Sequence, residues 1–466
     1  MFENIIAWIN DALYSYILII VLVLGGLYFS LGTKFVQFTK IKEQFRAITE
    51  KPKDKKGVSS FQALMVSTAS RVGTGNIVGV STALCLGGFG SVFWMWVIAI
   101  IGAASAFVES TLAQIYKKKG PDGSYGGPAY YIEAALGSRT LAVVFSVFLI
   151  LTYGIGFNML ASFNLQSTFA TYSFYDEGVS PWIIGLIIAA VVCFCLFGGG
   201  KRIVKATSYI VPVMGLSYIL VALIMTIMNA SALPAIIKEI FQRAFDFKSI
   251  FSGFAGSCVM YGIKRGLFSN EAGVGSAPNA SASADVAHPA KQGLVQVLSV
   301  FIDTLLICSA TAFMCMSSGI EPTPELSGAP YVQAAVKSVL GEFGPIFITV
   351  AMVLFAFTTL IGNLFYVDKA FCYLLGKTPN KIFNTIYYII ASLIILLGAG
   401  LSADLLWGIA DITMGGMALI NMPVIIILGK YAIRALDDFI KQRNQGKEPS
   451  FRAADIGLPH EVDYWK

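Results

Sequence analysis

Long, uninterrupted runs of apolar residues are the main pattern along the chain. Eleven such segments come close to the ~20 residues that an α-helix needs to cross a bilayer. They lie at roughly residues 13–33, 61–87, 90–116, 140–171, 181–198, 207–229, 250–284, 291–318, 344–376, 382–400 and 404–430. Three shorter stretches, at 127–136, 233–245 and 330–340, fit interfacial or partly inserted helices. The pattern therefore predicts an all-α polytopic membrane protein.

Composition supports this class and excludes others. Hydrophobic residues make up 56% of the chain and charged residues 13%, against roughly 45–50% and 25% in soluble domains. A transmembrane barrel would alternate in polarity over segments of about ten residues, whereas residues 17–28 and 183–197 are continuously apolar. With two histidines, and seven cysteines that all lie in apolar stretches, the chain lacks the spacing of a zinc centre or a Ser-His-Asp triad. We expect no enzyme activity.

The distribution of basic residues predicts the orientation in the membrane. Of the 33 Lys and Arg residues, 25 fall in alternate loops on one side and four on the other. Because cytoplasmic loops are enriched in Lys and Arg, the N-terminus is expected outside and the C-terminus in the cytoplasm. The net charge of +6 follows from these loops, and no basic run has the interleaved aromatics of a nucleic-acid site. The segment before residue 13 lacks the basic start of a signal peptide, so the first helix is expected to be retained.

This orientation divides the helices into two sets of opposite sense. We expect an extra N-terminal helix (1–37), a basic cytoplasmic loop (38–60), a first five-helix repeat (61–229), an external connection (230–249), a second five-helix inverted repeat (250–430) and a cytoplasmic tail (431–466). Each repeat opens with a glycine-interrupted stretch, 70–79 and 262–275. Paired interrupted helices in inverted halves are typical of secondary transporters and of their binding sites.

The first interruption contains the sequence Gly73-Thr74-Gly75-Asn76. A helix broken inside the membrane leaves backbone groups that ligand, ion or protein must satisfy. Freed N–H groups suit a carboxylate, and freed carbonyls suit a cation or an ammonium group, so a zwitterionic amino acid matches both. The alternative is that the glycines only allow close helix packing. A nucleotide loop is excluded because no Lys-Ser/Thr follows and no strand precedes.

Several longer motifs resemble one family. They lie at 69–80, 93–97, 126–132, 266–278, 288–293 and 301–304. Together they resemble the alanine or glycine:cation symporters of the amino acid–polyamine–organocation superfamily. The resemblance covers nearly the whole chain and implies a leucine-transporter-like five-plus-five inverted repeat with one extra helix. It also implies Na⁺-coupled uptake of small neutral amino acids across a prokaryotic cell membrane. The charge pattern indicates no nucleic-acid partner, and we infer no protein partner.

The resemblance also implies the site residues. A Na⁺ site would use the backbone carbonyls of Ala69 and Val72 and the hydroxyls of Thr358 and Thr359, although a threonine in a membrane helix more commonly bonds back to its own helix. The substrate would be surrounded by Gly73, Thr74, Gly75, Asn76, Phe163, Asn164, Phe268, Asn270, Thr359 and Asn363. The fourth helix departs from the family pattern, since it reads Ala-Ser-Phe-Asn-Leu-Gln over residues 161–166 where Gln-x-Asn is common.

Two features leave the substrate and the coupling ion open. Some family members carry Trp where this chain has Asn363, and the smaller Asn leaves room for glutamine or another polar neutral amino acid beside alanine or glycine. Intramembrane charges are costly and usually functional, and the chain has Arg71, Glu109, Glu271, Asp303 and Asp411 in apolar segments. We expect gating ion pairs, with Arg71 joined to one of these acids. If one carboxylate titrates during transport, H⁺ replaces Na⁺. An uncoupled facilitator or channel is a remoter alternative, without a selectivity loop or charged ring to support it.

Overall fold

A computed structural model describes residues 2–52, 57–120, 123–246, 257–459 and 462–466. Helices make up nearly all of its regular structure, and one short hairpin joins β1 (Lys118–Gly120) to β2 (Gly123–Tyr125). The helices up to the middle of the chain are α1 (Phe2–Ala12), α2 (Leu18–Gly32), α3 (Val36–Thr39), α4 (Ile41–Ile48), α5 (Ser60–Arg71), α6 (Val80–Gly87), α7 (Ser91–Ile115), α8 (Pro128–Leu136), α9 (Arg139–Leu149), α10 (Phe157–Ser167), α11 (Ser180–Leu196), α12 (Gly199–Met228) and α13 (Leu233–Ala244). The helices that follow are α15 (Cys258–Asn270), α16 (Pro278–Ser281), α17 (Pro289–Val300), α18 (Ser309–Ser317), α19 (Ala329–Leu340), α20 (Phe343–Leu375), α21 (Lys381–Ala399) and α22 (Ala403–Asn444).

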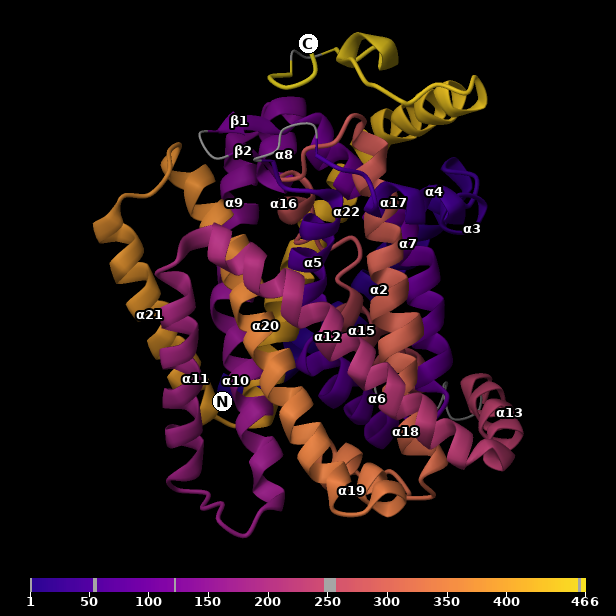
Figure 1. The fold of residues 1–466 in the computed structure, drawn as a ribbon, viewed down its shortest axis with the longest axis vertical. Coiled ribbons are helices and arrows are strands. Elements are labelled where there is room, and N and C mark those ends of the chain that lie inside the picture. The colour runs from indigo at the N-terminus through magenta and orange to yellow at the C-terminus, as the bar shows by residue number, and fades with distance from the viewer. Residues whose placement is uncertain (1, 53–56, 121–122, 247–256, 460–461) are drawn as a thin grey trace.

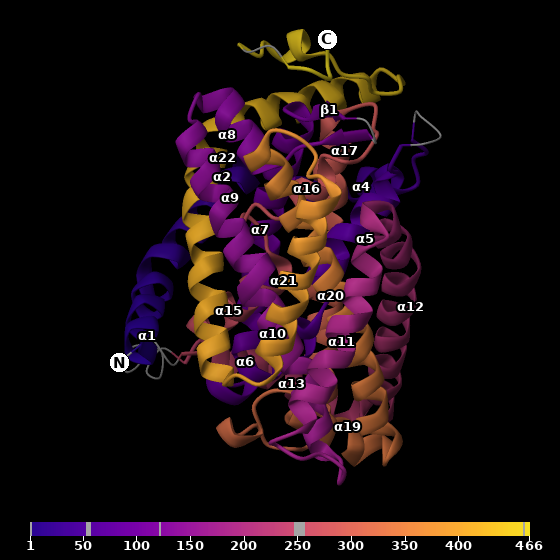
Figure 2. The same ribbon diagram turned by 90° about the vertical axis from the view of Figure 1, so that its left-hand side faces the viewer.

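The long helices run side by side along the longest axis of the molecule (Figure 1). Helices α3, α4 and α8, the hairpin and the C-terminal tail gather at one end, and α13 and α19 lie at the other (Figures 1 and 2). The three stretches predicted to be too short to span the membrane are the short helices α8, α13 and α19. The expected all-α membrane architecture is confirmed.

Seven described helices or helix pairs are long and apolar enough to cross a membrane. Wide π-helical turns join three pairs of helices: Leu13–Ile17 joins α1 to α2, Ile150–Gly156 joins α9 to α10, and Phe301–Cys308 joins α17 to α18. A further π-helical turn, Gly75–Gly79, precedes α6. The other predicted spans are shorter or interrupted apolar helices, such as α2 and α11. Within the predicted span 250–284, residues 250–256 lie outside the described part of the chain.

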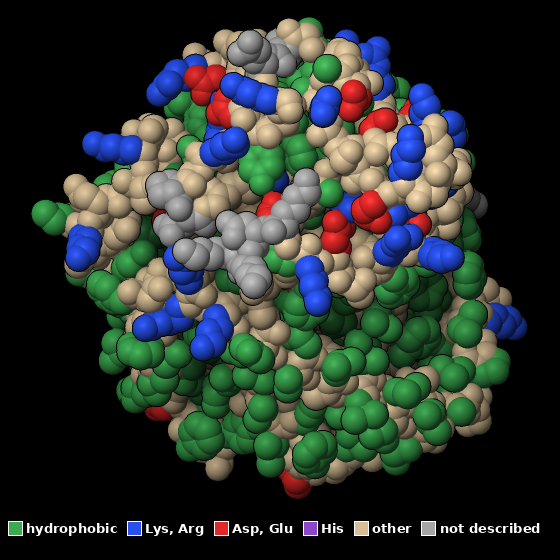
Figure 3. Space-filling view, turned by 45° about the horizontal axis from the view of Figure 1, so that its top comes forward, with side chains coloured by type: hydrophobic (Ala, Val, Ile, Leu, Met, Phe, Trp, Pro, Cys, Tyr) green, Lys and Arg blue, Asp and Glu red, His purple; other side chains and the backbone are tan. Residues whose placement is uncertain are grey.

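The surface and the interior differ as expected for a protein in lipid. Large apolar side chains are exposed along α11, α12 and α21, where lipid tails can cover them. By contrast, every residue of α17 is buried. Figure 3 shows Lys and Arg gathered at the end of the molecule that carries the C-terminus, above a surface covered by hydrophobic side chains. The polar helices α5, α15 and α17 therefore lie inside a lipid-facing shell.

Two helices end inside the bundle, and their sequences explain where. Helix α5 begins with a capping box, in which Ser59 accepts from the Gln62 backbone N–H and the Gln62 side chain accepts from the Ser59 N–H. It stops at Arg71, after which Val72 leaves helical geometry at φ −76° and ψ 89°. Helix α15 stops at Asn270 because Glu271 takes a left-handed conformation at φ 52°, which is uncommon for a residue other than glycine. These two breaks place backbone N–H and C=O groups without helical partners in the interior of the bundle.

The C-terminal segment packs against the end of the bundle. Helix α22 runs beyond the predicted span 404–430 to Asn444, because apolar residues continue at helical spacing on its buried face after the hydropathy has fallen. After α22 the chain folds back, and the Trp465 indole N–H donates to the Gln114 carbonyl at 2.7 Å. The Lys117 ammonium lies 3.9 Å from the centre of the Tyr464 ring. The tail is thus part of the folded structure.

Candidate substrate and cation site

A small cavity lies between the two helix breaks. Its lining comes from α5 and the residues after it, from the start of α10, from the end of α15 and the break that follows it, and from α20. The lining residues are Ser70, Arg71, Gly73, Thr74, Gly75, Phe157, Phe268, Glu271 and Thr359. Five of these nine, Gly73, Thr74, Gly75, Phe268 and Thr359, are among the residues predicted to bind the substrate.

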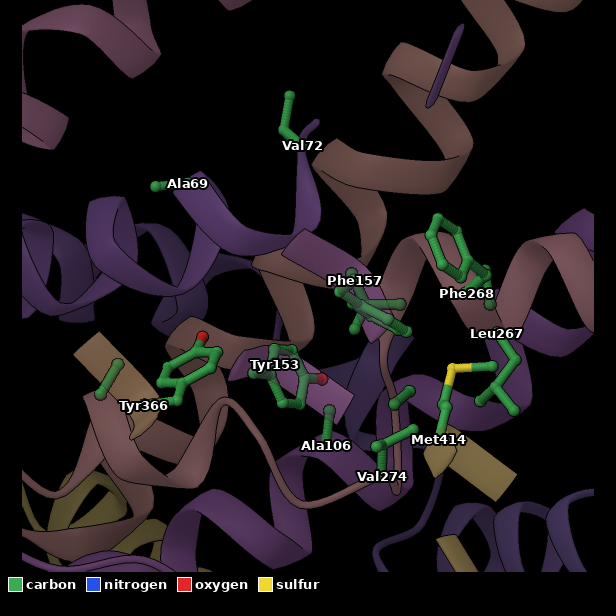
Figure 4. Close-up of a cluster of buried hydrophobic side chains, with 14 of the residues drawn as sticks. Ala69, Val72, Ala106, Tyr153, Phe157, Leu267, Phe268, Val274, Tyr366 and Met414 are labelled. Carbon is green, nitrogen blue, oxygen red and sulfur yellow. The ribbon is translucent and has the colours of Figure 1, made fainter. Parts of the chain in front are cut away.

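Aromatic side chains close one side of this cavity. Phe157 and Phe268 lie with ring centres 4.6 Å apart, and Phe268 also meets Trp407 edge to face at 4.8 Å. Figure 4 shows Phe157 and Phe268 among the buried side chains around the breaks. An added Cβ on Gly75 would come within 2.7 Å of the Phe268 ring, so glycine is required for this close approach. The cavity therefore has an apolar wall that small ligands can contact.

The residues predicted to hold Na⁺ lie where α5 ends beside α20. Thr359 Oγ1 is buried and has no hydrogen-bond partner in the described part of the chain, and it is the atom closest to the position of a Cβ on Gly73. Thr358 instead donates to the Leu354 carbonyl at 3.0 Å, which is the back-bond common in membrane helices. The Thr359 hydroxyl beside the end of α5 fits a small hard cation.

Asn76 ties the first break to a buried carboxylate. Its side-chain oxygen accepts the Gly73 backbone N–H at 2.8 Å, and its amide nitrogen donates to Asp303 Oδ1 at 2.7 Å. Ser269 and Thr304 donate to the other Asp303 oxygen at 2.8 and 2.7 Å. Asn76 therefore positions the backbone of the cavity wall, and it is not itself among the lining residues.

Asn363 has a similar supporting place. Ser70 donates to its side-chain oxygen at 2.7 Å, and its amide nitrogen donates to Asn158 at 3.0 Å. Ser70 also lies 3.1 Å from Glu271 Oε1, and Ser276 donates to the second Glu271 oxygen at 2.6 Å. A hydrogen-bonded chain therefore connects Asn363 on α20 to the cavity through Ser70.

The remaining predicted substrate residues divide between the cavity edge and its surroundings. The Asn164 amide donates to Thr74 Oγ1 at 3.2 Å, which places it directly behind a lining residue. Asn270 accepts from the Ala272 N–H at 3.1 Å, and its amide nitrogen is buried without a partner in the described part of the chain. Phe163 is half-buried and packs against the core, and it is not among the lining residues.

Four of the predicted gating charges, Arg71, Glu109, Glu271 and Asp303, form no close ion pair within the described residues. Arg71 Nη1 donates to Gln296 at 2.8 Å, and among the described residues no acid lies within 4.0 Å of its guanidinium. Glu109 accepts from Asn421 at 2.9 Å and from the Gly273 N–H at 3.4 Å. These acids are satisfied mainly by amides, hydroxyls and backbone N–H groups.

A close ion pair occurs one turn before Phe268. Arg265 lies 3.3 Å and Lys264 2.9 Å from the Asp411 carboxylate, and the guanidinium of Arg265 stacks on Trp407 at 3.8 Å. The side chain of Asn10, on α1, accepts from Lys264 at 3.0 Å. This cluster links the extra N-terminal helix to the aromatic wall of the cavity.

Two lining residues, Ser70 and Phe157, are absent from the sequence-based site. Ser70 lies inside the interrupted motif that predicted the break, so the residues around it already indicated this part of the cavity. Phe157 follows the wide turn Ile150–Gly156, and the glycines Gly154 and Gly156 are the local sign of that turn. Periodicity alone does not show that the turn faces a helix break distant in sequence.

Comparison with known proteins identifies relatives over nearly the whole chain. The model of the sodium:alanine symporter family matches residues 1–453. The amino-acid carrier protein AlsT of Bacillus subtilis is 42% identical, with 100% of this chain and 98% of that protein covered. The same organism's probable sodium/glutamine symporter GlnT is 42% identical (99% and 96% covered), and its putative sodium/proton-dependent alanine carrier protein YrbD is 41% identical (99% and 97% covered).

A solved structure has the same fold. The crystal structure of MhsT in complex with L-phenylalanine superposes with a TM-score of 0.53 at 16% sequence identity, over 87% of this chain and 92% of that one. This likeness supports the leucine-transporter-like architecture that the family resemblance implies. Relatives that match over their full length are named carriers and symporters, and the protein is accordingly a transporter and not an enzyme. The chain belongs to the sodium:alanine symporter family.

Proposed function

We propose that this protein carries a small neutral amino acid, alanine or glycine, into the cell together with Na⁺. The observation that carries the proposal is Thr359 Oγ1, a buried hydroxyl without a partner in the described structure that lies beside Gly73 at the end of α5. A buried polar atom left unsatisfied costs free energy, and a bound cation would satisfy it. The carbonyls of Ala69 and Val72 and the hydroxyls of Thr358 and Thr359 would form the Na⁺ site.

The shape and polarity of the cavity support a small zwitterionic substrate. Glu271 and Arg71 supply opposite charges in its lining, while Phe157 and Phe268 supply an apolar wall. Opposite charges suit the ends of an amino acid, and a short wall suits a short side chain. Gly73, Thr74 and Gly75 would contact the substrate directly, while Asn76, Asn164 and Asn363 hold these contacts in place.

Transport would proceed by alternating access around this cavity. Arg265, which pairs with Asp411, lies one turn before Phe268 on the N-terminal side of α15, beside the aromatic wall. Opening one side requires these contacts to separate, while the tail contacts such as Trp465 to Gln114 close the end where the C-terminus lies. With the N-terminus outside, as the basic loops predict, the aromatic wall would face the exterior of the cell membrane.

Uptake into proteoliposomes tests the proposal. Purified protein would be supplied with radiolabelled alanine or glutamine under an inward Na⁺ gradient, an inward H⁺ gradient or no gradient. We expect alanine to accumulate only with Na⁺. Accumulation with H⁺ alone would move the coupling to a buried carboxylate, and equilibration without a gradient would indicate a facilitator.

A second candidate is the uptake of glutamine by the same site. Asn363 in place of a larger residue, and a relative named a probable sodium/glutamine symporter, support it. The name of a sodium/proton-dependent relative supports testing H⁺ coupling in the same experiment. The relative rates for alanine and glutamine decide between the two substrates.

A further inference from the structure

Arg71 is a buried cation whose hydrogen-bonding capacity is largely unused. Only 2% of the residue is exposed, and Nη1 donates to Gln296 at 2.8 Å. The other two guanidinium nitrogens, Nε and Nη2, are buried without an acceptor in the described part of the chain. Leaving charged donors buried and unsatisfied is costly, so the arrangement calls for an anionic partner.

The two unused nitrogens have a specific geometry. Nε and Nη2 form one edge of the planar guanidinium, and their N–H groups point in parallel. Such an edge binds both oxygens of one carboxylate in a bidentate contact. Arg71 also lines the cavity between the helix breaks. An anion that enters this cavity therefore meets a preformed carboxylate-binding group.

The protein's own acids do not fill this edge. Glu271 has one oxygen 3.1 Å from Ser70 and the other 2.6 Å from Ser276. Asp303 accepts from Asn76 and Ser269, and Glu109 from Asn421. Each carboxylate already has hydrogen-bond donors, and each lies beyond ion-pair distance of Arg71 within the described residues.

One of the backbone donors expected at the first break is already occupied. The Gly73 N–H, which the interrupted helix would offer to a carboxylate, donates to the Asn76 side chain at 2.8 Å. The break therefore does not present this N–H to a ligand. The guanidinium edge of Arg71 offers two further buried donors in the lining of the same cavity.

We propose that Arg71 binds the α-carboxylate of the transported amino acid through Nε and Nη2, and that Glu271, across the same cavity, faces its α-ammonium group. This inference rests on the proposed function and makes it more specific. It defines the substrate class as amino acids with a free carboxylate, whatever their side chain. Amino acid amides and decarboxylated amines are excluded, because they leave the guanidinium unpaired.

Ligand competition tests the inference. Purified protein in saturating Na⁺ would bind radiolabelled alanine, or glutamine if that is the better substrate, in competition with the unlabelled amino acid or its α-amide. We expect the wild-type protein to prefer the free amino acid strongly. Arg71→Gln should lower affinity for the amino acid roughly 10- to 100-fold and leave affinity for the amide nearly unchanged. Arg71→Lys keeps the charge but loses the bidentate Nε and Nη2 edge. Its affinity for the amino acid should lie between those of the wild-type protein and Arg71→Gln.

Matched variants separate binding from a structural role. Arg139→Gln removes the same charge from an exposed site and should keep the wild-type preference. Glu109 interacts electrostatically with Arg71 and is not a lining residue, so Arg71→Gln combined with Glu109→Gln tests charge balance. Recovery of wild-type affinity in that double variant would overturn the inference, as would an unchanged preference in Arg71→Gln. If Arg71→Gln fails to fold, Arg71→Lys with the wild-type preference would be equally decisive.

The outcomes also separate this inference from the proposed function. A wild-type protein that binds neither alanine nor glutamine contradicts the proposed function itself. A wild-type protein that transports one of them but binds its amide as tightly contradicts only the role of Arg71. The direct comparison of acid and amide at one fixed Na⁺ concentration thus tests the guanidinium separately from transport.

Discussion

Gly362 on α20 lies against the end of α5, where the candidate Na⁺ carbonyls are. A Cβ added there would lie 2.9 Å from the Ser70 backbone nitrogen and 3.2 Å from the Ala69 carbonyl carbon. Both contacts are with backbone atoms, so no side-chain rotation can relieve them. Gly362→Ala must therefore move α5 and α20 apart beside the carbonyl of Ala69.

The size of this movement can be worked from the contacts. Ordinary contacts begin near 3.5 Å, so the helices must separate by about 0.5 Å. Overpacking of this kind costs about 1–3 kcal/mol, and binding sites lose function when displaced by roughly 0.5 Å. We expect Gly362→Ala to weaken Na⁺ binding tenfold or more, since about 1.4 kcal/mol corresponds to a factor of ten.

Gly215→Ala provides the matched control. Gly215 is a buried helical glycine in α12, and its added Cβ would meet only Ile307 Cδ1 at 3.8 Å. The free energy of unfolding of Gly215→Ala should be unchanged or higher by up to about 1 kcal/mol, because alanine favours the helix more than glycine does. The assay is the Na⁺ concentration for half-maximal amino acid uptake, with Na⁺-dependent thermal stabilisation as a second readout. Wild-type Na⁺ dependence in folded Gly362→Ala would refute the placement of the cation site between α5 and α20.

Three further predictions concern the cavity support and the tail. Asn363→Trp should reduce glutamine uptake more than alanine uptake, because the larger side chain displaces Ser70 toward the cavity; equal losses in parallel uptake assays would contradict this. Trp465→Ala should release the tail to limited proteolysis, since it removes a buried indole worth roughly 3–5 kcal/mol and its bond to Gln114; unchanged protection would argue against tail docking. Burial lowers the pKa of His288 below its usual 6.5, although the hydrogen bond with Asp438 opposes this. Thermal stability should therefore be full above pH 6.5 and fall as the pH drops below it, and His288→Gln should flatten this profile in a pH series.

The sequence predicted the elements of the fold well because each depends on a local signal. Apolar length identified the helices, including the short α8, α13 and α19, and glycine placement identified the break at Gly73 to Gly75. The end of α22 was less predictable, since its last turns leave the hydrophobic zone and continue as an amphipathic helix to Asn444. The run of high hydropathy ends at the membrane boundary, whereas the helical spacing of apolar residues continues beyond it.

The site was harder to predict because its assembly depends on which helices meet. The break motifs predicted most of the lining, but the partners of the buried charges were not readable. Arg71 was expected to pair with an acid, and the structure places Gln296 beside it, while Asp411 pairs with Arg265 and Lys264. Distances between helices far apart in sequence decide such pairs, and residue types alone do not.

Thr359 lies between the two candidate ligands, since it lines the cavity and borders the end of α5. A hydroxyl shared in this way would couple the two binding equilibria. By linkage, the factor by which Na⁺ raises affinity for the amino acid must then equal the factor by which the amino acid raises affinity for Na⁺. Neither dissociation constant is then a property of the protein alone. Each has meaning only at a stated concentration of the other ligand, and the measured coupling factor gives the interaction free energy between the two bound ligands.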